Sequence, residues 1–110
     1  MKILNLAEMK LGWFIGNFEP CAYKTDQFEV GIKEYFLKNF VQEKPHFHKV
    51  ATEITCIYSG EVLINGEVYK SGSIIVVEPN EVIDFKPLTD KVVTLVVKTP
   101  SKISDKFFTC

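Results

Sequence analysis

Short segments in which hydrophobic and polar residues alternate recur along most of the chain. In residues 28–33, positions 28, 30 and 32 are apolar, whereas positions 29 and 33 are charged. A period of two is typical of a β-strand with one buried side and one solvent-facing side. Helical periodicity is weak throughout, so the sequence predicts an all-β fold. Further segments of this kind, rich in β-branched and aromatic residues, lie at 53–58, 61–64, 67–70, 73–77, 82–85 and 91–98.

One turn in this pattern is specified by its residues. Asn65 and Gly66 separate two of the segments, and both central positions of a type I′ turn need positive φ, which these residue types adopt readily. The sequence therefore predicts a tight hairpin at this point. Other turn signals follow at spacings of about 8 to 12 residues, which favours a sandwich or a small barrel. Residues 87–90 are expected to form one more loop.

Two of the predicted strands, residues 74–77 and 92–97, are apolar at nearly every position. A strand of this kind needs cover on both of its sides. Either a second sheet or a second copy of the chain must supply that cover. The pattern favours a homodimer, because a small barrel has little chain left over to cover the outside of its own sheet.

The composition indicates one globular domain. The 110 residues fit the prior of about 100 to 200 per domain, and 46% of them are hydrophobic. We expect a single domain over 1–110, with its core at about 28–99, an N-terminal arm at 1–11 and a C-terminal tail at 101–110. Aromatic residues in this domain more often belong to a core or interface than to a pocket, and this applies to Trp13, Phe14, Phe18, Tyr35 and Phe36.

Charge and cysteine content restrict the partners and the compartment. The formal net charge is -1, so neither nucleic acid nor an anionic membrane is an expected partner. All 13 basic residues are lysines, which excludes a bidentate guanidinium clamp on an anion. No apolar run reaches the about 18 residues of a membrane helix. The three cysteines form an odd set without a CxxC spacing, and we expect a reducing, cytoplasmic location.

The candidate chemistry lies between residues 46 and 53. His46 and His48 are the two histidines of the chain, and on an extended strand two residues with this spacing point to the same side. Glu53 follows five residues later. Two imidazoles and a carboxylate suit a divalent cation such as Mn, Fe, Ni or Zn. The alternative is a pair of surface histidines beside a solvated glutamate.

The spacing of these residues resembles the first signature of the cupin family. The string is His46-x-His48, four residues, Glu53, six residues and Gly60, and Gly72 with Pro79 resembles the start of the second cupin signature. The resemblance implies a double-stranded β-helix, or jelly-roll barrel, with a divalent metal held inside by His46, His48 and Glu53. Asp84 stands where the family has its third histidine, and an aspartate can bind the same metals. Asp84 is thus the fourth predicted ligand.

The same resemblance implies small-molecule chemistry inside the barrel. Small stand-alone cupins similar to the C-terminal barrel of phosphomannose isomerase suggest a carbohydrate isomerase or epimerase. Four alternatives stay open: a metal-dependent lyase or oxygenase, a cupin that binds a sugar or another small ligand without catalysis, a barrel that has lost its site, and a metal-free isomerase. In the last case a histidine beside Glu53 or Asp84 would act as general base. The lack of arginine argues against a nucleotide-linked sugar as the substrate.

Overall fold

The protein is built almost entirely of short β-strands. A computed structural model describes residues 1–109, and Cys110, the last residue of the predicted tail, lies outside this range. Two single-turn 3-10 helices, η1 (Leu6–Glu8) and η2 (Leu37–Asn39), interrupt the strands. The strands in the described range are β1 (Trp13–Gly16), β2 (Tyr23–Lys24), β3 (Glu29–Phe36), β4 (His46–Phe47), β5 (Thr52–Ser59), β6 (Glu61–Ile64), β7 (Glu67–Lys70), β8 (Ile74–Val77), β9 (Phe85–Pro87), β10 (Lys91–Thr99) and β11 (Phe107–Phe108).

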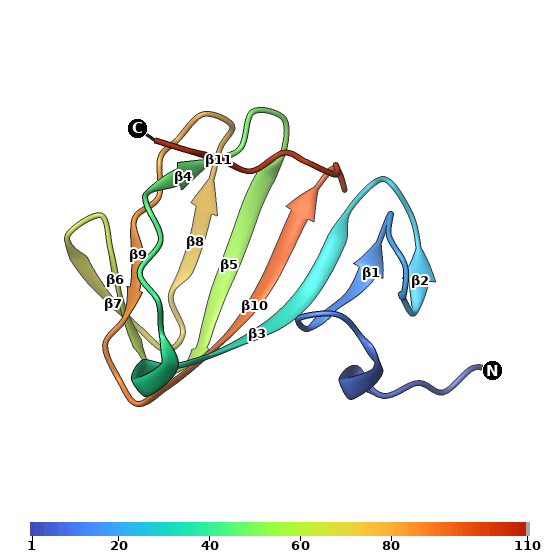
Figure 1. Ribbon diagram of the computed structural model, residues 1–110, viewed down its shortest axis with the longest axis horizontal. Coiled ribbons are helices and arrows are strands. Elements are labelled where there is room, and N and C mark those ends of the chain that lie inside the picture. The colour runs from blue at the N-terminus through green and yellow to red at the C-terminus, as the bar shows by residue number, and fades with distance from the viewer. Residues whose placement is uncertain (110) are drawn as a thin grey trace.

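Three sheets are arranged as two facing walls. The large sheet has the strand order β2-β1-β3-β10-β5-β8, and all of its neighbouring strands are antiparallel except β1 and β2. The small sheets have the orders β7-β6-β9 and β11-β4. Figure 1 shows the small sheets on the left, facing the curved large sheet, with both β4 and β11 near the top. The all-β prediction is confirmed.

The apolar core fills one end of the space between the walls. Ile57 of β5, Val62 and Ile64 of β6, and Val92 of β10 form a buried cluster. On β5, alternate positions point to the same side of the sheet, so Ile57 faces the same way as Glu53. The other end of the interior is therefore lined by the polar part of the same strands, and this is where the candidate site lies.

The predicted hairpin is confirmed, whereas the strand predicted at 82–85 is wrong. Asn65 and Gly66 have φ of 49° and 83° and join β6 to β7. The later strand, β9, begins only at Phe85. Its predicted first half is held by the side chain of Asn65, which donates to the carbonyl of Val82 (3.0 Å) and accepts from the backbone N–H of Asp84 (2.8 Å).

Pro87 belongs to a strand, although the sequence places it in a loop. It is opposite Val62 in the pairing of β9 with β6. A proline cannot donate a ladder hydrogen bond, and such residues are confined mainly to edge strands. β9 is the edge strand of its three-stranded sheet. The N–H that Pro87 lacks is therefore not missing from an interior strand.

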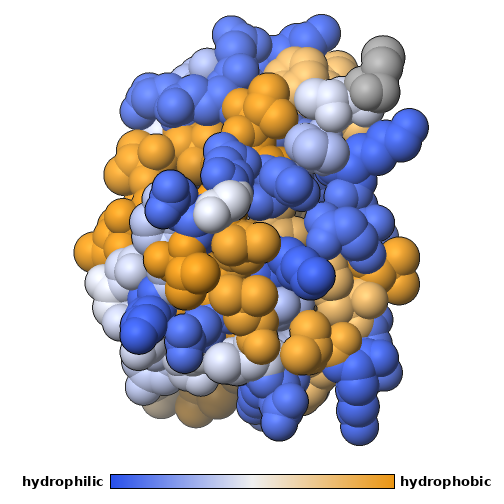
Figure 2. Space-filling view, turned by 90° about the vertical axis from the view of Figure 1, so that its left-hand side faces the viewer, coloured by the Kyte–Doolittle hydropathy of each residue, from blue (hydrophilic) through white to orange (hydrophobic). Residues whose placement is uncertain are grey.

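The two ends of the chain take part in the sheets. β1 joins the large sheet beside β3, and β11, within the predicted tail, pairs with β4. On the side of the small sheets, Figure 2 shows hydrophobic residues interspersed with hydrophilic ones. No helix among residues 1–109 is long and apolar enough to cross a membrane.

Candidate functional site

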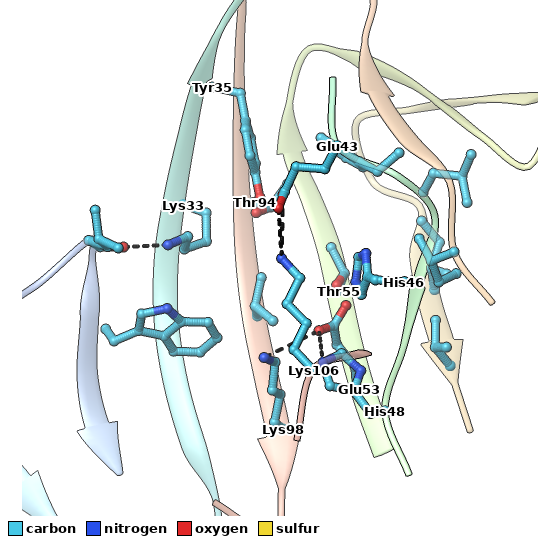
Figure 3. A pocket seen from close by; sticks show the side chains of 18 of the residues that line it. Lys33, Tyr35, Glu43, His46, His48, Glu53, Thr55, Thr94, Lys98 and Lys106 are labelled. Atoms are coloured by element: carbon cyan, nitrogen blue, oxygen red, sulfur yellow. Dashed lines mark hydrogen bonds and ion pairs between the residues drawn. The ribbon is translucent and has the colours of Figure 1, made fainter. Parts of the chain in front are cut away.

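A cavity of about 320 Å³ lies between the two walls. It is polar at the end away from the apolar core, where the two histidines face β5 and β10 (Figure 3). The residues that line it are Leu11, Trp13, Lys33, Tyr35, Phe40, Glu43, Lys44, His46, His48, Glu53, Thr55, Ile64, Ile75, Val77, Ile83, Phe85, Thr94, Val96, Lys98 and Lys106.

The histidines are placed by β4 and by the residues that flank it. His46 exchanges both backbone hydrogen bonds with Ile83, at 2.9 and 2.8 Å. His48 follows β4, and its ring centroid lies 5.5 Å from that of His46. His48 is only 4% exposed, and its Nε2 has no hydrogen-bond partner among residues 1–109. The fold thus brings a buried, unsatisfied imidazole nitrogen to the wall of the cavity.

Glu53 lies between one histidine and one lysine. Its Oε2 is 3.9 Å from His48 Nε2 and 3.8 Å from Lys98 Nζ (Figure 3). Glu53 on β5 and Lys98 on β10 are directly opposite in the strand pairing, so they necessarily share a face. Burial raises the pKa of Glu53, and the positive charge of Lys98 partly offsets this increase. The Glu53 carboxylate therefore lies close both to the imidazole of His48 and to the ammonium group of Lys98.

Both histidines are held in the neutral form. Burial lowers the pKa of His48 to about 4, with a further contribution from Lys98. Burial also lowers the pKa of His46, and Lys106 adds to the effect. Neutral imidazoles carry a free nitrogen lone pair, which a cation or a proton of a bound molecule can use.

The loop that follows His48 is fixed by a carboxylate from the C-terminal segment. Asp105, only 6% exposed, accepts hydrogen bonds from the backbone N–H groups of Lys49 (3.0 Å), Val50 (3.1 Å) and Ala51 (2.9 Å). Burial alone would raise the pKa of Asp105, but these three donors outweigh it and the pKa is lowered. The carboxylate is thus anionic, and it anchors the chain on the C-terminal side of His48.

Asp84 is not brought together with the other predicted ligands. Its neighbours Ile83 and Phe85 line the cavity, whereas Asp84 is absent from the lining. Successive side chains of an extended segment point to opposite sides, which explains why Asp84 is directed away. Its Oδ1 accepts a hydrogen bond of 3.3 Å from Gln42 Nε2. The third histidine of the cupin signature therefore has no counterpart in this cavity at position 84.

Comparison with solved structures identifies the architecture. A conserved protein of Klebsiella pneumoniae with a double-stranded β-helix domain is 19% identical, with a TM-score of 0.64 over 76% of this chain and 71% of that one. An RmlC-like cupin of Methanocaldococcus jannaschii is 20% identical, with a TM-score of 0.60 over 70% and 73%. The chain has the cupin fold. The double-stranded β-helix expected from the sequence is thus confirmed.

A cupin-fold enzyme is also among the similar structures. The DMSP lyase DddQ of Ruegeria pomeroyi is 17% identical, with a TM-score of 0.68 over 86% of this chain. The match covers 48% of that protein, so the chain spans about half the length of the lyase. No protein-family model and no curated protein matches the sequence.

The donors that face this cavity from its two walls suit a divalent cation. His46, His48 and Glu53 offer two neutral nitrogens and one carboxylate, a set that first-row divalent metals accept. The unsatisfied Nε2 of His48 is the kind of atom that a bound cation would engage. In the range 1–109, however, no three potential ligands lie close enough together to hold an ion as they stand. Binding would require Glu53 to turn from Lys98 toward the histidines.

Several cavity residues were not found from the sequence. Trp13 is predicted to be a core or interface residue, and instead it lines the cavity. Tyr35 packs against the apolar core as predicted, and it also lines the cavity. The predicted sides of β3 are inverted, because Lys33 faces the cavity while Val30 and Ile32 lie on the opposite side. A signal for Lys98 was available. It lies in phase with Val92, Thr94 and Val96, which point inward, so the polar end of β10 could have been predicted.

Proposed function

We propose that the cavity of this cupin binds a small polar molecule and that His46, His48 and Glu53 hold a divalent metal ion beside it. The observation that carries the proposal is the buried Nε2 of His48, which lines the cavity and has no hydrogen-bond partner in the described part of the chain. A buried polar atom without a partner costs about 1–3 kcal/mol. A ligand or metal that engages this nitrogen would remove that cost.

The residues of the site divide into three roles. The two neutral imidazoles and the carboxylate of Glu53 offer the donors, and a bound divalent ion would act as a Lewis acid that polarises an oxygen of the molecule. Lys98 balances the charge of Glu53. The wall of Ile75, Ile83 and other apolar residues limits the water around the reacting atoms. The chemistry proposed is isomerisation or epimerisation of a carbohydrate-type molecule.

The metal component is tested by elemental analysis of protein purified without a metal-affinity tag. We expect about one Mn, Fe, Ni or Zn per chain, and a rise in melting temperature when Mn, Ni or Zn is added after chelation. The variant with both His46→Ala and His48→Ala is expected to lose both effects. Metal content and melting shifts that stay unchanged in the double variant would contradict the assignment of the ligands.

A metal-free acid–base reaction is the second candidate. The observation in its favour is the position of the Glu53 carboxylate, which lies 3.9 Å from His48 Nε2 and 3.8 Å from Lys98 Nζ. Nε2 of His48 would accept a proton from the hydroxyl-bearing carbon next to a carbonyl of the molecule and return it to the former carbonyl carbon. The proton of that hydroxyl would pass to the former carbonyl oxygen, so that the hydroxyl carbon becomes the new carbonyl. The carboxylate of Glu53 would stabilise the imidazolium formed in between.

Proton exchange distinguishes these candidates. Small aldoses and ketoses are incubated with the protein in D2O, and exchange at the carbon next to the carbonyl is followed by NMR, with chelator and with added metal. Exchange that depends on metal supports the first candidate, and exchange that persists with chelator supports the second. Saturable sugar binding without exchange would instead indicate the non-catalytic cupin. Absence of both exchange and binding would contradict a carbohydrate substrate.

We further propose that a second copy of the chain covers the outer side of the large sheet, as expected from its doubly apolar strands. Ile74 and Val76 of β8 are 68% and 53% exposed, and Leu95 of β10 is 41% exposed. Two rows of uncharged residues run across four strands in register: Ile32, Leu95, Cys56 and Ile74, and Val30, Val97, Ile54 and Val76. When two copies of this surface meet around a twofold axis, no like charges come to lie opposite each other.

A further inference from the structure

The tryptophan of the cavity lies close to two lysine ammonium groups. Nζ of Lys33 is 5.2 Å from the Trp13 ring centroid, and Nζ of Lys98 is 5.1 Å from it. Gly31 provides the space for this ring, because a Cβ at position 31 would lie 2.7 Å from Cε3 of Trp13. Figure 3 shows Lys33 and Lys98 on the same side of the large sheet, and the two lysines come from β3 and β10. The large sheet thus presents two cations at one end of the cavity.

These ammonium groups have more donors than the protein satisfies. A lysine ammonium has three N–H donors. Lys33 Nζ donates to the carbonyl of Leu11 at 2.6 Å, and Lys98 Nζ has only the 3.8 Å ion contact with Glu53 among the described residues. No carboxylate in residues 1–109 lies within 4.0 Å of Lys33 Nζ. Both groups therefore keep donors for a further acceptor.

The charges that line the cavity leave an excess of positive charge. Four lysines (Lys33, Lys44, Lys98 and Lys106) and two glutamates (Glu43 and Glu53) belong to the lining. One of these glutamates, Glu43, forms an ion pair with Lys106, with 3.4 Å between Oε1 and Nζ. Burial lowers the pKa of Lys33, and the like charge of Lys98 lowers it further. A negative group near both ammonium groups would offset the cost of burying the charge of Lys33 and the repulsion between the two lysines.

We propose that Lys33, Lys98 and Trp13 form a subsite for an anionic oxygen group, a carboxylate or a phosphate, of the small molecule. The group would receive hydrogen bonds from both lysines and lie near the edge of the indole, where the ring quadrupole is positive. The remainder of the molecule would extend past Glu53 to His46 and His48. This inference rests on the proposed function only for the identity of the cavity as a small-molecule site. It adds a charge requirement to the substrate.

Trp13 is the only tryptophan of the chain, so its fluorescence reports directly on this subsite. The full-length protein is titrated with malonate and, separately, with inorganic phosphate, and both titrations are repeated with Lys33→Gln, Lys98→Gln and the control Lys70→Gln. Lys70 is exposed on β7 and is not part of the cavity. We expect a saturable change in the wild type and the control. Each cavity variant should bind about tenfold more weakly or worse, the loss expected for a charge-assisted hydrogen bond.

Arginine variants keep the test valid if a glutamine variant is poorly folded. Lys98→Arg and Lys33→Arg retain the positive charge and are expected to retain most of the response. A response to malonate alone assigns a carboxylate, and a response to phosphate alone assigns a phosphate. No saturable response to either anion in the wild type would overturn the proposal. An equal response in the wild type and in folded Lys33→Gln and Lys98→Gln would also overturn it.

The double variant with His46→Ala and His48→Ala separates this inference from the metal assignment. It keeps both lysines and Trp13, so the anion response is expected to persist while any metal-dependent rise in melting temperature is lost. Failure of metal binding would then leave the anion result intact, and the reverse also holds. A folded double variant without anion response would show that the anion binds at the histidines rather than at the lysines, which contradicts the subsite.

Discussion

The carboxylate of Asp105 lies 2.9 Å from the backbone nitrogen of Ala51, although 54 positions separate the two residues in the sequence. The same carboxylate accepts hydrogen bonds from the next two backbone N–H groups toward His48. The C-terminal segment therefore holds the loop that begins at a histidine of the site. The position of that histidine depends on residues that carry none of the cupin signature.

Replacing Asp105 with alanine should destabilise the protein. Three backbone donors would lose their acceptor, and we expect the free energy of unfolding to fall by about 3 kcal/mol. Asp105→Asn keeps one side-chain oxygen, so its free energy of unfolding should lie between those of the wild type and the alanine variant. Urea denaturation at pH 7 measures both values. Stability within about 0.5 kcal/mol of the wild type for the alanine variant would show that the loop is held by other contacts.

Gly31→Ala should displace the indole of Trp13. The added Cβ would lie 2.7 Å from the ring, and overpacking of this kind costs about 1–3 kcal/mol. We expect a shifted emission maximum of this single tryptophan and a lower melting temperature. Gly66→Ala is a useful comparison, because a Cβ there meets no atom within 4 Å and only the positive φ of the turn is strained. An unchanged emission spectrum in Gly31→Ala would contradict the close approach.

The chelated protein should lose stability as the pH falls from about 6.5 to about 4. Histidine titrates near 6.5 in the unfolded chain, whereas the pKa of His48 is about 4 in the folded protein. Between these pH values the unfolded chain binds more protons at position 48 than the folded protein does. The contribution of His48 to the free energy of unfolding is therefore complete above pH 6.5 and is lost on acidification, by up to about 1.4 kcal/mol per pH unit. The charged and titratable groups that act on it are Lys98, His46, Asp105, Lys106 and Glu53.

A comparison of His48→Gln with the wild type isolates this effect. Other groups, including Glu53 with its raised pKa, titrate in both proteins, so the difference in unfolding free energy should carry the slope of His48. Denaturation at pH 4, 5, 6 and 7 measures it. A difference that is constant over this range would mean that His48 titrates alike in the folded and unfolded states.

Asp84→Ala should leave the metal-dependent rise in melting temperature unchanged. Its carboxylate is outside the cavity and is in contact with Gln42. At a hundredfold excess of metal over Kd, binding stabilises a folded protein by about 2.7 kcal/mol, which is easily measured in a thermal melt. Glu53→Gln should lose most of this increment. Equal losses in the two variants would restore Asp84 as a ligand.

Val76→Glu should prevent dimerisation. The residue lies on the outer side of β8 and is 53% exposed, so the charge is tolerated in one chain but would be buried between two. Light scattering at micromolar concentration should give twice the chain mass of 12.6 kDa for the wild type and a single chain mass for the variant. Val68→Glu on β7 serves as a matched exposed control. A wild-type mass of one chain would contradict the dimer.

The alternation of residue types predicted where the strands lie but not always which side faces inward. In β3 the side that carries Lys33 points into the cavity, because the interior of this barrel is partly a polar chamber rather than a continuous apolar core. Lys33 is the example: the alternation assigned it to solvent, yet it lines the cavity. Pattern alone cannot distinguish water outside a sheet from a polar cavity inside it.

The spacing of the first signature brings its residues to one cavity, whereas the spacing of the second does not. His46 and His48 lie at β4 and face Glu53 on β5 across this cavity. Asp84 lies in a segment whose local hydrogen bonds go to Asn65, and counting residues could not reveal the resulting phase of its side chain. Asp105 and Lys106 come from a segment without any motif, and only tertiary contacts place them at the site.

The loop at residues 49–51 meets Asp105 through its backbone alone. The exposed side chains of Lys49 and Val50 can therefore vary without loss of the contact, provided that each N–H is kept, whereas the buried Ala51 must stay small. Proline is the exception, because it lacks that donor. Among relatives of this chain, position 105 should stay acidic, position 51 should stay small, and positions 49 and 50 should vary but avoid proline.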